Sequence, residues 1–177
     1  MIDHYRQARH ELDNGPFATT EIVVGGVPMR VFVAAPPTLR MLWQLTAAHG
    51  DKTYIVYEDE RLTYSEVHAQ VRSLAHYLQA SGVGRGDRVA IAMRNYPEWV
   101  VAYWATVSIG AAVVGMNAWW TSAEMEFGLA DSRPKVLIAD DERLERALPV
   151  LDGLRALAPL HVIAVRSDRS LPIDSAQ

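Results

Sequence analysis

The clearest fold signal in the chain comes from residues 63–120, TYSEVHAQVRSLAHYLQASGVGRGDRVAIAMRNYPEWVVAYWATVSIGAAVVGMNAWW. Thr63 and Glu66 have the spacing of a capping box, in which a hydroxyl and a carboxylate satisfy amides at the start of a helix. Apolar residues then recur at helical spacing until a glycine turn, and apolar runs over 87–93 and 111–115 frame a second helix. The stretch therefore predicts helices that alternate with buried strands.

The same alternation continues to residue 165. Thr121 and Glu124 form another capping-box pattern, and the expected elements after it are a strand over 135–139, a helix over 141–157 and a strand over 160–165. Strands that are apolar on both faces and are joined by helices predict parallel pairing. The fold class is therefore α/β, a three-layer sandwich with a mostly parallel sheet covered by helices on both faces.

The front of the chain has a different pattern. Residues 1–14 predict a short polar helix or a loosely held arm, and two β-rich runs within 21–33 surround Gly25 and Gly26. Two glycines between such runs predict an N-terminal β-hairpin with a type I′ turn, because that turn needs positive φ at both positions. We expect the hairpin to pack at an edge of the sheet.

The remaining elements complete the division of the chain into three segments. Between the hairpin and Thr63 we expect a helix over 38–49, a strand over 53–57 and a polar turn over 58–61; farther on, Asn95 is expected to cap the helix that contains Pro97. The segments are an N-terminal arm and hairpin (1–36), an α/β subdomain (37–165) and a tail or truncated linker (166–177).

Composition excludes several functional classes. The chain has no cysteine, which removes disulfides and thiolate catalysis, and its formal net charge of −4 comes without a basic run, so no nucleic-acid partner is expected. The first residues are charged and form no secretory signal. Residues 99–120 carry no charge, but small and polar interruptions favour a buried helix followed by a buried strand over a membrane span. We expect a cytoplasmic protein, with peripheral membrane contact left open.

Most motif-like patterns have ordinary structural explanations. The glycines of 82–86 close a helix and lead into a strand, whereas a dinucleotide loop must follow a strand and open a helix. The six histidines lack metal-ligand spacing, so no metal site is expected. Carboxylates that could form a catalytic pair are better explained as turn and first-turn residues; they are Asp59, Glu60, Asp140, Asp141 and Glu142.

Two groups of residues are candidates for ligand contacts. Asn117, Trp119 and Trp120 follow a buried strand, where open α/β sheets place ligand crevices, and we consider them for substrate binding. Core packing is the competing role for the tryptophans. Arg143 and Arg146 lie one turn apart near the start of a helix and could bind a cofactor phosphate, with simple solvation as the alternative.

Several motifs in this order resemble the N-terminal region of the AMP-forming acyl-CoA synthetases, the acyl-adenylate-forming family, and of their fatty-acyl members in particular. The motifs are Leu62–Val67, Gly82–Ile91, Asn95–Glu98, Ile109–Val114, Asn117 and Ala130–Ile138. No single motif is specific, but their order and spacing together are, from about Thr38 to about Val165. One departure is that the family often has a proline before the asparagine, where this chain has Met116.

The resemblance implies a two-step reaction in the full-length enzyme. A carboxylate such as a fatty acid attacks ATP to give an acyl-adenylate and pyrophosphate, and coenzyme A then takes the acyl group, with Mg²⁺ required. The family's phosphate-binding Ser/Thr/Gly-rich loop with its lysine has no counterpart here, and neither does its small C-terminal domain. We therefore assign no catalytic residue and expect no cofactor for this fragment alone. It is expected to be an inactive scaffold and a wall of the acyl pocket.

Two alternatives from other classes remain. The chain could be a non-catalytic truncated homologue that acts as a partner-binding or dimerisation module, and a homodimer is left open in either case. The weaker alternative is a Rossmann-like nucleotide binder.

Overall fold

The structure is a computed structural model that describes residues 2–168 of the chain. The N-terminal arm consists of helix α1 (Ile2–Asn14) and a hairpin of strands β1 (Thr19–Val24) and β2 (Val27–Phe32). The hairpin turn has φ of 57° at Gly25 and 85° at Gly26, as the glycine pair predicts.

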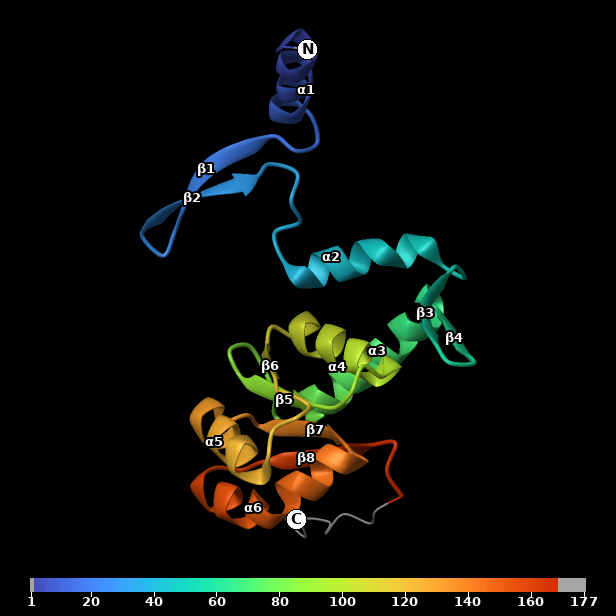
Figure 1. Cartoon of the computed structure of the whole chain (residues 1–177), viewed down its shortest axis with the longest axis vertical. Helices are drawn as coiled ribbons and strands as arrows, with labels where there is room; N and C mark the ends of the chain where they lie inside the picture. Colours follow the sequence, from blue (N-terminus) through green and yellow to red (C-terminus); the bar gives the residue numbers. More distant parts are fainter. Residues whose placement is uncertain (1, 169–177) are drawn as a thin grey trace.

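The position of this hairpin corrects the sequence prediction. β1 and β2 pair only with each other among the described strands, and nearly all of their residues are exposed. Figure 1 shows the arm standing apart from the rest of the molecule, with helix α2 (Leu39–Leu45) between it and the sheet. The linker contains Pro36 and Pro37, whose restricted backbone keeps it extended and carries the hairpin away from the sheet edges.

A second hairpin replaces the polar turn that the sequence predicts over 58–61. Strand β3 (Thr53–Tyr57) pairs antiparallel with β4 (Glu60–Thr63), and Glu58 makes the turn with a φ of 48°. α2 continues into a short 3-10 helix, η1 (Thr46–His49), before this hairpin. Because the side chains of β4 are mostly polar, its sequence carried no strand pattern; pairing with β3 creates the strand.

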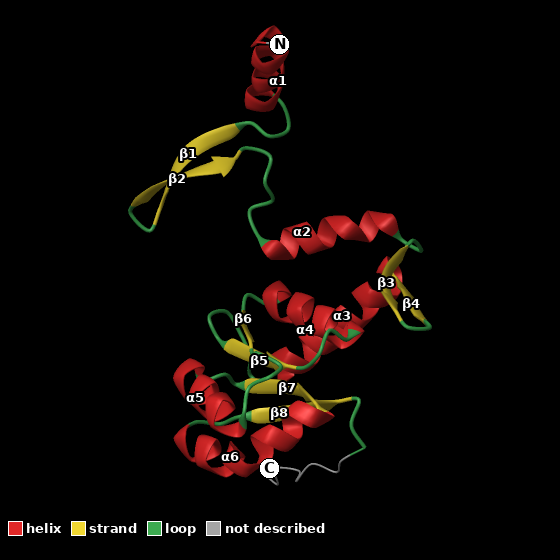
Figure 2. Ribbon diagram, in the orientation of Figure 1, coloured by secondary structure: helices red, strands yellow, loops and turns green. Residues whose placement is uncertain are grey.

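The main sheet has four parallel strands in the order β6–β5–β7–β8. Its strands are β5 (Arg88–Ala92), β6 (Ala112–Gly115), β7 (Val136–Asp140) and β8 (His161–Val165), and its helices are α3 (Tyr64–Ala80), α4 (Pro97–Ser108), α5 (Ser122–Ser132) and α6 (Asp141–Leu157). Helices α3 and α4 cover one face, and α5 and α6 cover the other (Figure 2). The predicted three-layer α/β sandwich is confirmed.

The two faces of the central strands fill two separate cores. In β5, Val89 and Ile91 pack with the α3–α4 layer, whereas Ala90 and Ala92 pack with the α5–α6 layer. All four are almost completely buried. This is why the strand is apolar throughout instead of alternating: side chains of successive residues point to opposite faces, and both faces are covered.

The helix starts agree with the sequence at two places and differ at one. Thr63 with Glu66, and Thr121 with Glu124, form complete capping boxes. Asn95 does not cap α4: Tyr96 occupies that position without a side-chain hydrogen bond. Proline favours the first helical position, so Pro97 makes the residue directly before it the cap.

Arg166, the first residue after β8, ties this strand to two other elements. It forms ion pairs with Glu60 of β4 and Glu98 of α4, at 2.7 and 3.0 Å, and its guanidinium lies over the rings of Tyr57 and Tyr96. The segment boundary predicted at 166 stays a prediction, and residues 169–177 lie outside the described part. Among the described helices, none is long and apolar enough to cross a membrane.

Candidate functional site

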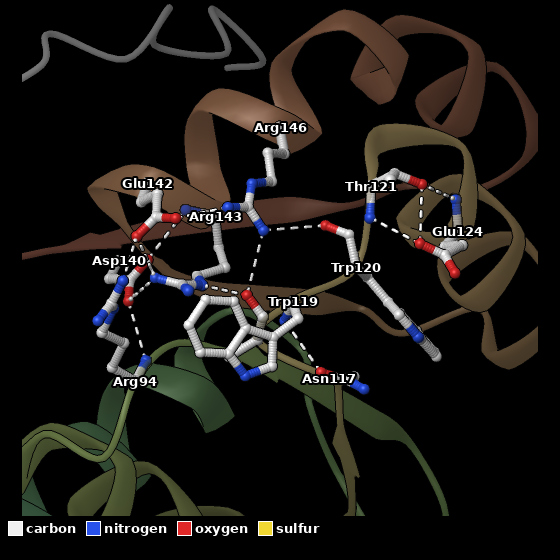
Figure 3. A network of polar contacts seen from close by, with 11 residues as sticks. Arg94, Asn117, Trp119, Trp120, Thr121, Glu124, Asp140, Glu142, Arg143 and Arg146 are labelled. Atoms are coloured by element: carbon white, nitrogen blue, oxygen red, sulfur yellow. Dashed lines mark hydrogen bonds and ion pairs between the residues drawn. The ribbon is translucent and has the colours of Figure 1, made fainter.

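The strand order places a candidate site at the carboxyl ends of the parallel strands. Strand β5 lies between β6 and β7 in the sheet. The helix that follows β5, α4, covers one face of the sheet, and the helix that follows β7, α6, covers the other face. The chain therefore leaves these two neighbouring strands in opposite directions. Open α/β sheets bind ligands in the crevice that such a divergence opens. Arg94 follows β5, residues 117–120 follow β6, and Asp140 ends β7. These segments meet at one edge of the sheet (Figure 3).

Asp140 and Arg143 form a buried ion pair at the centre of this edge. Both side chains are almost completely buried, with Asp140 Oδ2 3.2 Å from Arg143 Nη1. Asp140 also accepts hydrogen bonds from the backbone amides of Arg94 and Arg143, each at 2.9 Å. The carboxylate therefore caps α6 and joins the ends of β5 and β7 across the crevice. A buried charge needs such partners because its desolvation is costly.

Glu142 connects three arginines on the outer side of that pair. Its carboxylate accepts hydrogen bonds from Arg94 at 3.0 Å, Arg143 at 2.8 Å and Arg146 at 2.5 Å. The hydrogen bond from Arg94 is the main cause that lowers the pKa of Glu142, and the three positive charges act in the same direction. The carboxylate is therefore charged at neutral pH and holds the guanidiniums in fixed orientations.

Two of these arginines clamp the loop that contains the predicted substrate residues. Arg143 Nε donates to the carbonyl oxygen of Ala118 at 2.8 Å, and Arg146 Nη1 donates to those of Ala118 and Trp120 at 3.1 Å each. Asn117 Oδ1 accepts from the amide of Trp119 at 2.9 Å and fixes the turn from within. The loop is thus held by side chains from a helix that follows it in the sequence by more than twenty residues.

The two tryptophans of the loop have different environments. Trp119 is 74% exposed, and its ring contacts solvent on this edge while the Arg94 guanidinium lies 5.5 Å from the ring centre. Trp120 is half-buried and packs against α5, where a methyl group at Gly128 would lie only 2.6 Å from its Cζ3 atom. Trp119 is therefore available to a ligand, whereas Trp120 mainly fixes the loop to the helix.

The fold brings all five predicted site residues to one place, but their ligand roles stay predictions. The sequence suggested a phosphate partner for Arg143 and Arg146; in the structure they bind carbonyl oxygens and carboxylates of the chain itself. Sequence reasoning did not identify Arg94, and it treated Asp140 and Glu142 as ordinary helix-start residues. The usable signal was an aspartate at the end of an otherwise apolar strand.

Neither lysine of the chain lies at this edge, and the described residues form no metal site. Lys135 lies at the opposite end of the sheet, before β7, where its ammonium pairs with Asp87 at 2.8 Å. Lys52 precedes β3 and is exposed. Within residues 2–168 no three carboxylate or imidazole side chains gather as a metal site would require. The edge can therefore present an aromatic surface backed by a rigid charged network.

A family model and curated relatives both match this chain to enzymes that bind AMP or form acyl-CoA. Residues 42–175, about three quarters of the chain, match the family model described as AMP-binding enzyme. A long-chain-fatty-acid–CoA ligase of Bacillus subtilis strain 168 is 32% identical over 108 residues, which are 61% of this chain and 19% of that protein. The medium/long-chain-fatty-acid–CoA ligase FadD6 of Mycobacterium tuberculosis is 36% identical over 132 residues, covering 71% of this chain and 21% of the relative.

Solved structures extend the likeness to the fold. A crystal structure from Rhodopseudomonas palustris CGA009, provisionally named a long-chain-fatty-acid CoA ligase, superposes with a TM-score of 0.70 and 31% identity. The match covers 76% of this chain and 34% of that one. The chain spans about a fifth of the length of these curated relatives. It therefore belongs to the AMP-binding enzyme family and matches the N-terminal part of the family's acyl-CoA ligases.

Proposed function

We propose that this chain is the N-terminal subdomain of an ATP-dependent fatty-acyl-CoA synthetase. The full reaction joins a fatty acid to coenzyme A through an acyl-adenylate, with pyrophosphate released in the first step and AMP in the second. The names of the relatives support a fatty acid as the carboxylate. The observation that carries the proposal is the edge around Trp119, a rigid aromatic surface at the position where α/β sheets bind ligands.

In this proposal the chain is a scaffold and one wall of the acyl pocket. Trp119 offers its exposed ring to the acyl group, and Asn117 and Trp120 hold the loop in place. Arg143 and Arg146 are positioning residues that act through the loop. Phosphate binding by these arginines stays a prediction, and a phosphate would first have to displace their carboxylate and carbonyl partners.

The family implies ATP, Mg²⁺ and coenzyme A, but the described residues do not fit a site for ATP or Mg²⁺. The guanidiniums of the edge bind carboxylates and carbonyl oxygens of the chain, and Arg143 Nη2, which has no hydrogen-bond partner among the described residues, is buried. Lys135 pairs with Asp87 at the opposite end, and no metal-ligand cluster occurs within residues 2–168. We therefore infer that this chain alone does not form acyl-adenylate. A cytoplasmic location is part of the same proposal.

Exchange of labelled pyrophosphate into ATP tests the inactivity of the isolated chain. With fatty acids of several lengths we expect exchange no greater than in the protein-free control, because residues 2–168 present no group placed to stabilise charge on a transferring phosphate. Fatty-acid-dependent exchange by the purified chain would show that the described residues do suffice.

Complementation tests the positive half of the proposal. The ligase FadD6 without its matching N-terminal region is mixed with this chain, and we expect part of the exchange activity to return. The mixture with the Trp119→Ala variant should recover less, and the Tyr77→Ala variant, which changes an exposed ring on α3, serves as the matched control. Recovery that is equal for both variants would argue against an acyl-wall role for Trp119.

The alternative is a non-catalytic module for a partner or for dimerisation. It is favoured by the β1–β2 hairpin, whose apolar residues are exposed on a segment that contacts little else in the described chain; they include Ile22, Val24, Val27 and Phe32. Light scattering of the purified chain distinguishes the two: a stable dimer together with failed complementation would favour the module.

A further inference from the structure

A hollow separate from the Trp119 edge lies between α2, η1, α3 and the end of α4. It has a volume of about 410 Å³, which is within the range of small-molecule sites. None of the residues that line it belongs to the loop at 117–120 or to α6. The hollow therefore shares no residue with the Trp119 edge.

Helical spacing explains how the walls are built. On α3, His68, Arg72 and His76 follow one another at intervals of four residues and share one face of the helix. Val71 and Ala75 form an apolar row beside them. On the other side, α2 contributes Arg40 and Trp43, so that each wall offers both charge and apolar surface.

The charge around the hollow is positive and uncompensated. Two arginines and two histidines line it, and none of the lining residues is an aspartate or glutamate. Arg94, Arg143, Arg146 and Arg166 each have a carboxylate partner, whereas Arg40 and Arg72 have no ion pair with any residue of the described part. Cations that gather without a counter-charge repel one another and attract an anion.

His68 and Ser108 add hydrogen-bonding groups. The His68 ring stacks on Trp43 with 3.9 Å between the ring centres, and its Nε2 lies 3.0 Å from Thr46 Oγ1. That hydroxyl already donates to the carbonyl of Trp43 at 2.7 Å, so it accepts from Nε2–H, and Nδ1 is left as the second polar atom of the ring. Ser108 Oγ is buried and has no hydrogen-bond partner among the described residues.

We propose that this hollow binds a small organic anion with an apolar body, of the aryl phosphate class. Arg40 and Arg72 bind the phosphate, since guanidinium groups match phosphate geometry. Trp43, Val71 and Ala75 contact the apolar body. The ring of 1-naphthyl phosphate is small enough for the volume and carries the required charge, so it serves as the probe.

Calorimetric titration of the full chain with 1-naphthyl phosphate tests the proposal, with 1-naphthol and inorganic phosphate as separate arms. We expect a dissociation constant below about 1 mM for the aryl phosphate, and weaker binding of each half alone. Arg40→Gln and Arg72→Gln should each weaken binding by about tenfold or more, because each removes a charged hydrogen bond. Arg30→Gln removes the same charge from exposed strand β2 and should change binding by less than about twofold.

A histidine titration by NMR gives a second readout that does not depend on variants. Burial, and secondly the positive charge of Arg72, lower the pKa of His68 in the free chain. The other charged or titratable residues that line the hollow are Arg40 from α2 and His76 from α3. A bound anion favours the protonated ring, so the probe should raise the pKa of His68.

Three results would each overturn the proposal. They are failure of the aryl phosphate to bind, binding of 1-naphthol as tight as that of 1-naphthyl phosphate, and a loss of binding in the Arg30→Gln variant equal to the losses in Arg40→Gln and Arg72→Gln.

Discussion

Replacement of Gly128 by alanine is a direct test of how Trp120 is packed. The new methyl group would lie 2.6 Å from Cζ3 of the Trp120 ring, closer than carbon atoms can approach, and 3.1 Å from Cη2, which is also a tight contact. Overpacking of this kind costs about 1–3 kcal/mol. Alanine also favours the helix over glycine by about 1 kcal/mol. The net change in the free energy of unfolding is therefore a loss of about 0–2 kcal/mol.

A double-mutant cycle separates the two contributions. In the Trp120→Ala background the ring is gone, so Gly128→Ala should only improve the helix and stabilise the chain by about 1 kcal/mol. The coupling energy between the two sites should then be about 1–3 kcal/mol, equal to the steric cost.

Urea unfolding of the four proteins, followed by circular dichroism, measures this cycle. Dichroism is preferable to fluorescence because one of the chain's five tryptophans is removed in two of the variants. Comparable slopes against urea must first establish that the variants unfold alike. If Gly128→Ala has the same effect in both backgrounds within about 0.5 kcal/mol, Trp120 does not pack on α5 and the account of the loop is wrong.

Three further predictions concern the caps and the charged network. Removal of the hydroxyl in Thr63→Ala or Thr121→Ala should each lower the free energy of unfolding by about 1 kcal/mol in urea titrations, and an unchanged midpoint would contradict the capping boxes. Asp140→Ala leaves the buried Arg143 guanidinium without its buried carboxylate partner and should cost about 3–5 kcal/mol, measured in the same way; a loss below about 1 kcal/mol would show that the pair is solvated. Because the folded-state pKa of Glu142 is lowered, its stabilising contribution is complete above the ordinary value of 4.5 and is lost as the pH falls through the folded value. Glu142→Gln should therefore flatten the loss of stability in this acidic range, and an unaltered pH profile would contradict it.

The layers of this fold could be predicted because their signals are local. Capping boxes, glycine turns and uninterrupted apolar strands are readable within a few residues, and they placed α3, β5, α5 and β7 correctly. Strand β4 was missed because its polar residues form a strand only by pairing with β3. The position of the β1–β2 hairpin also could not be inferred, since no local pattern states what a hairpin packs against.

The candidate site shows the same division. The sequence alone determined that Asn117–Trp120 and Arg143–Arg146 follow buried strands, because an apolar run and a helix start mark such points. Only the tertiary structure decided that the order β6–β5–β7 brings them together, and that the arginines bind the loop's carbonyl oxygens. The physical reason is that hydrogen bonds between residues more than twenty positions apart depend on strand order, which the pattern of any single segment does not contain.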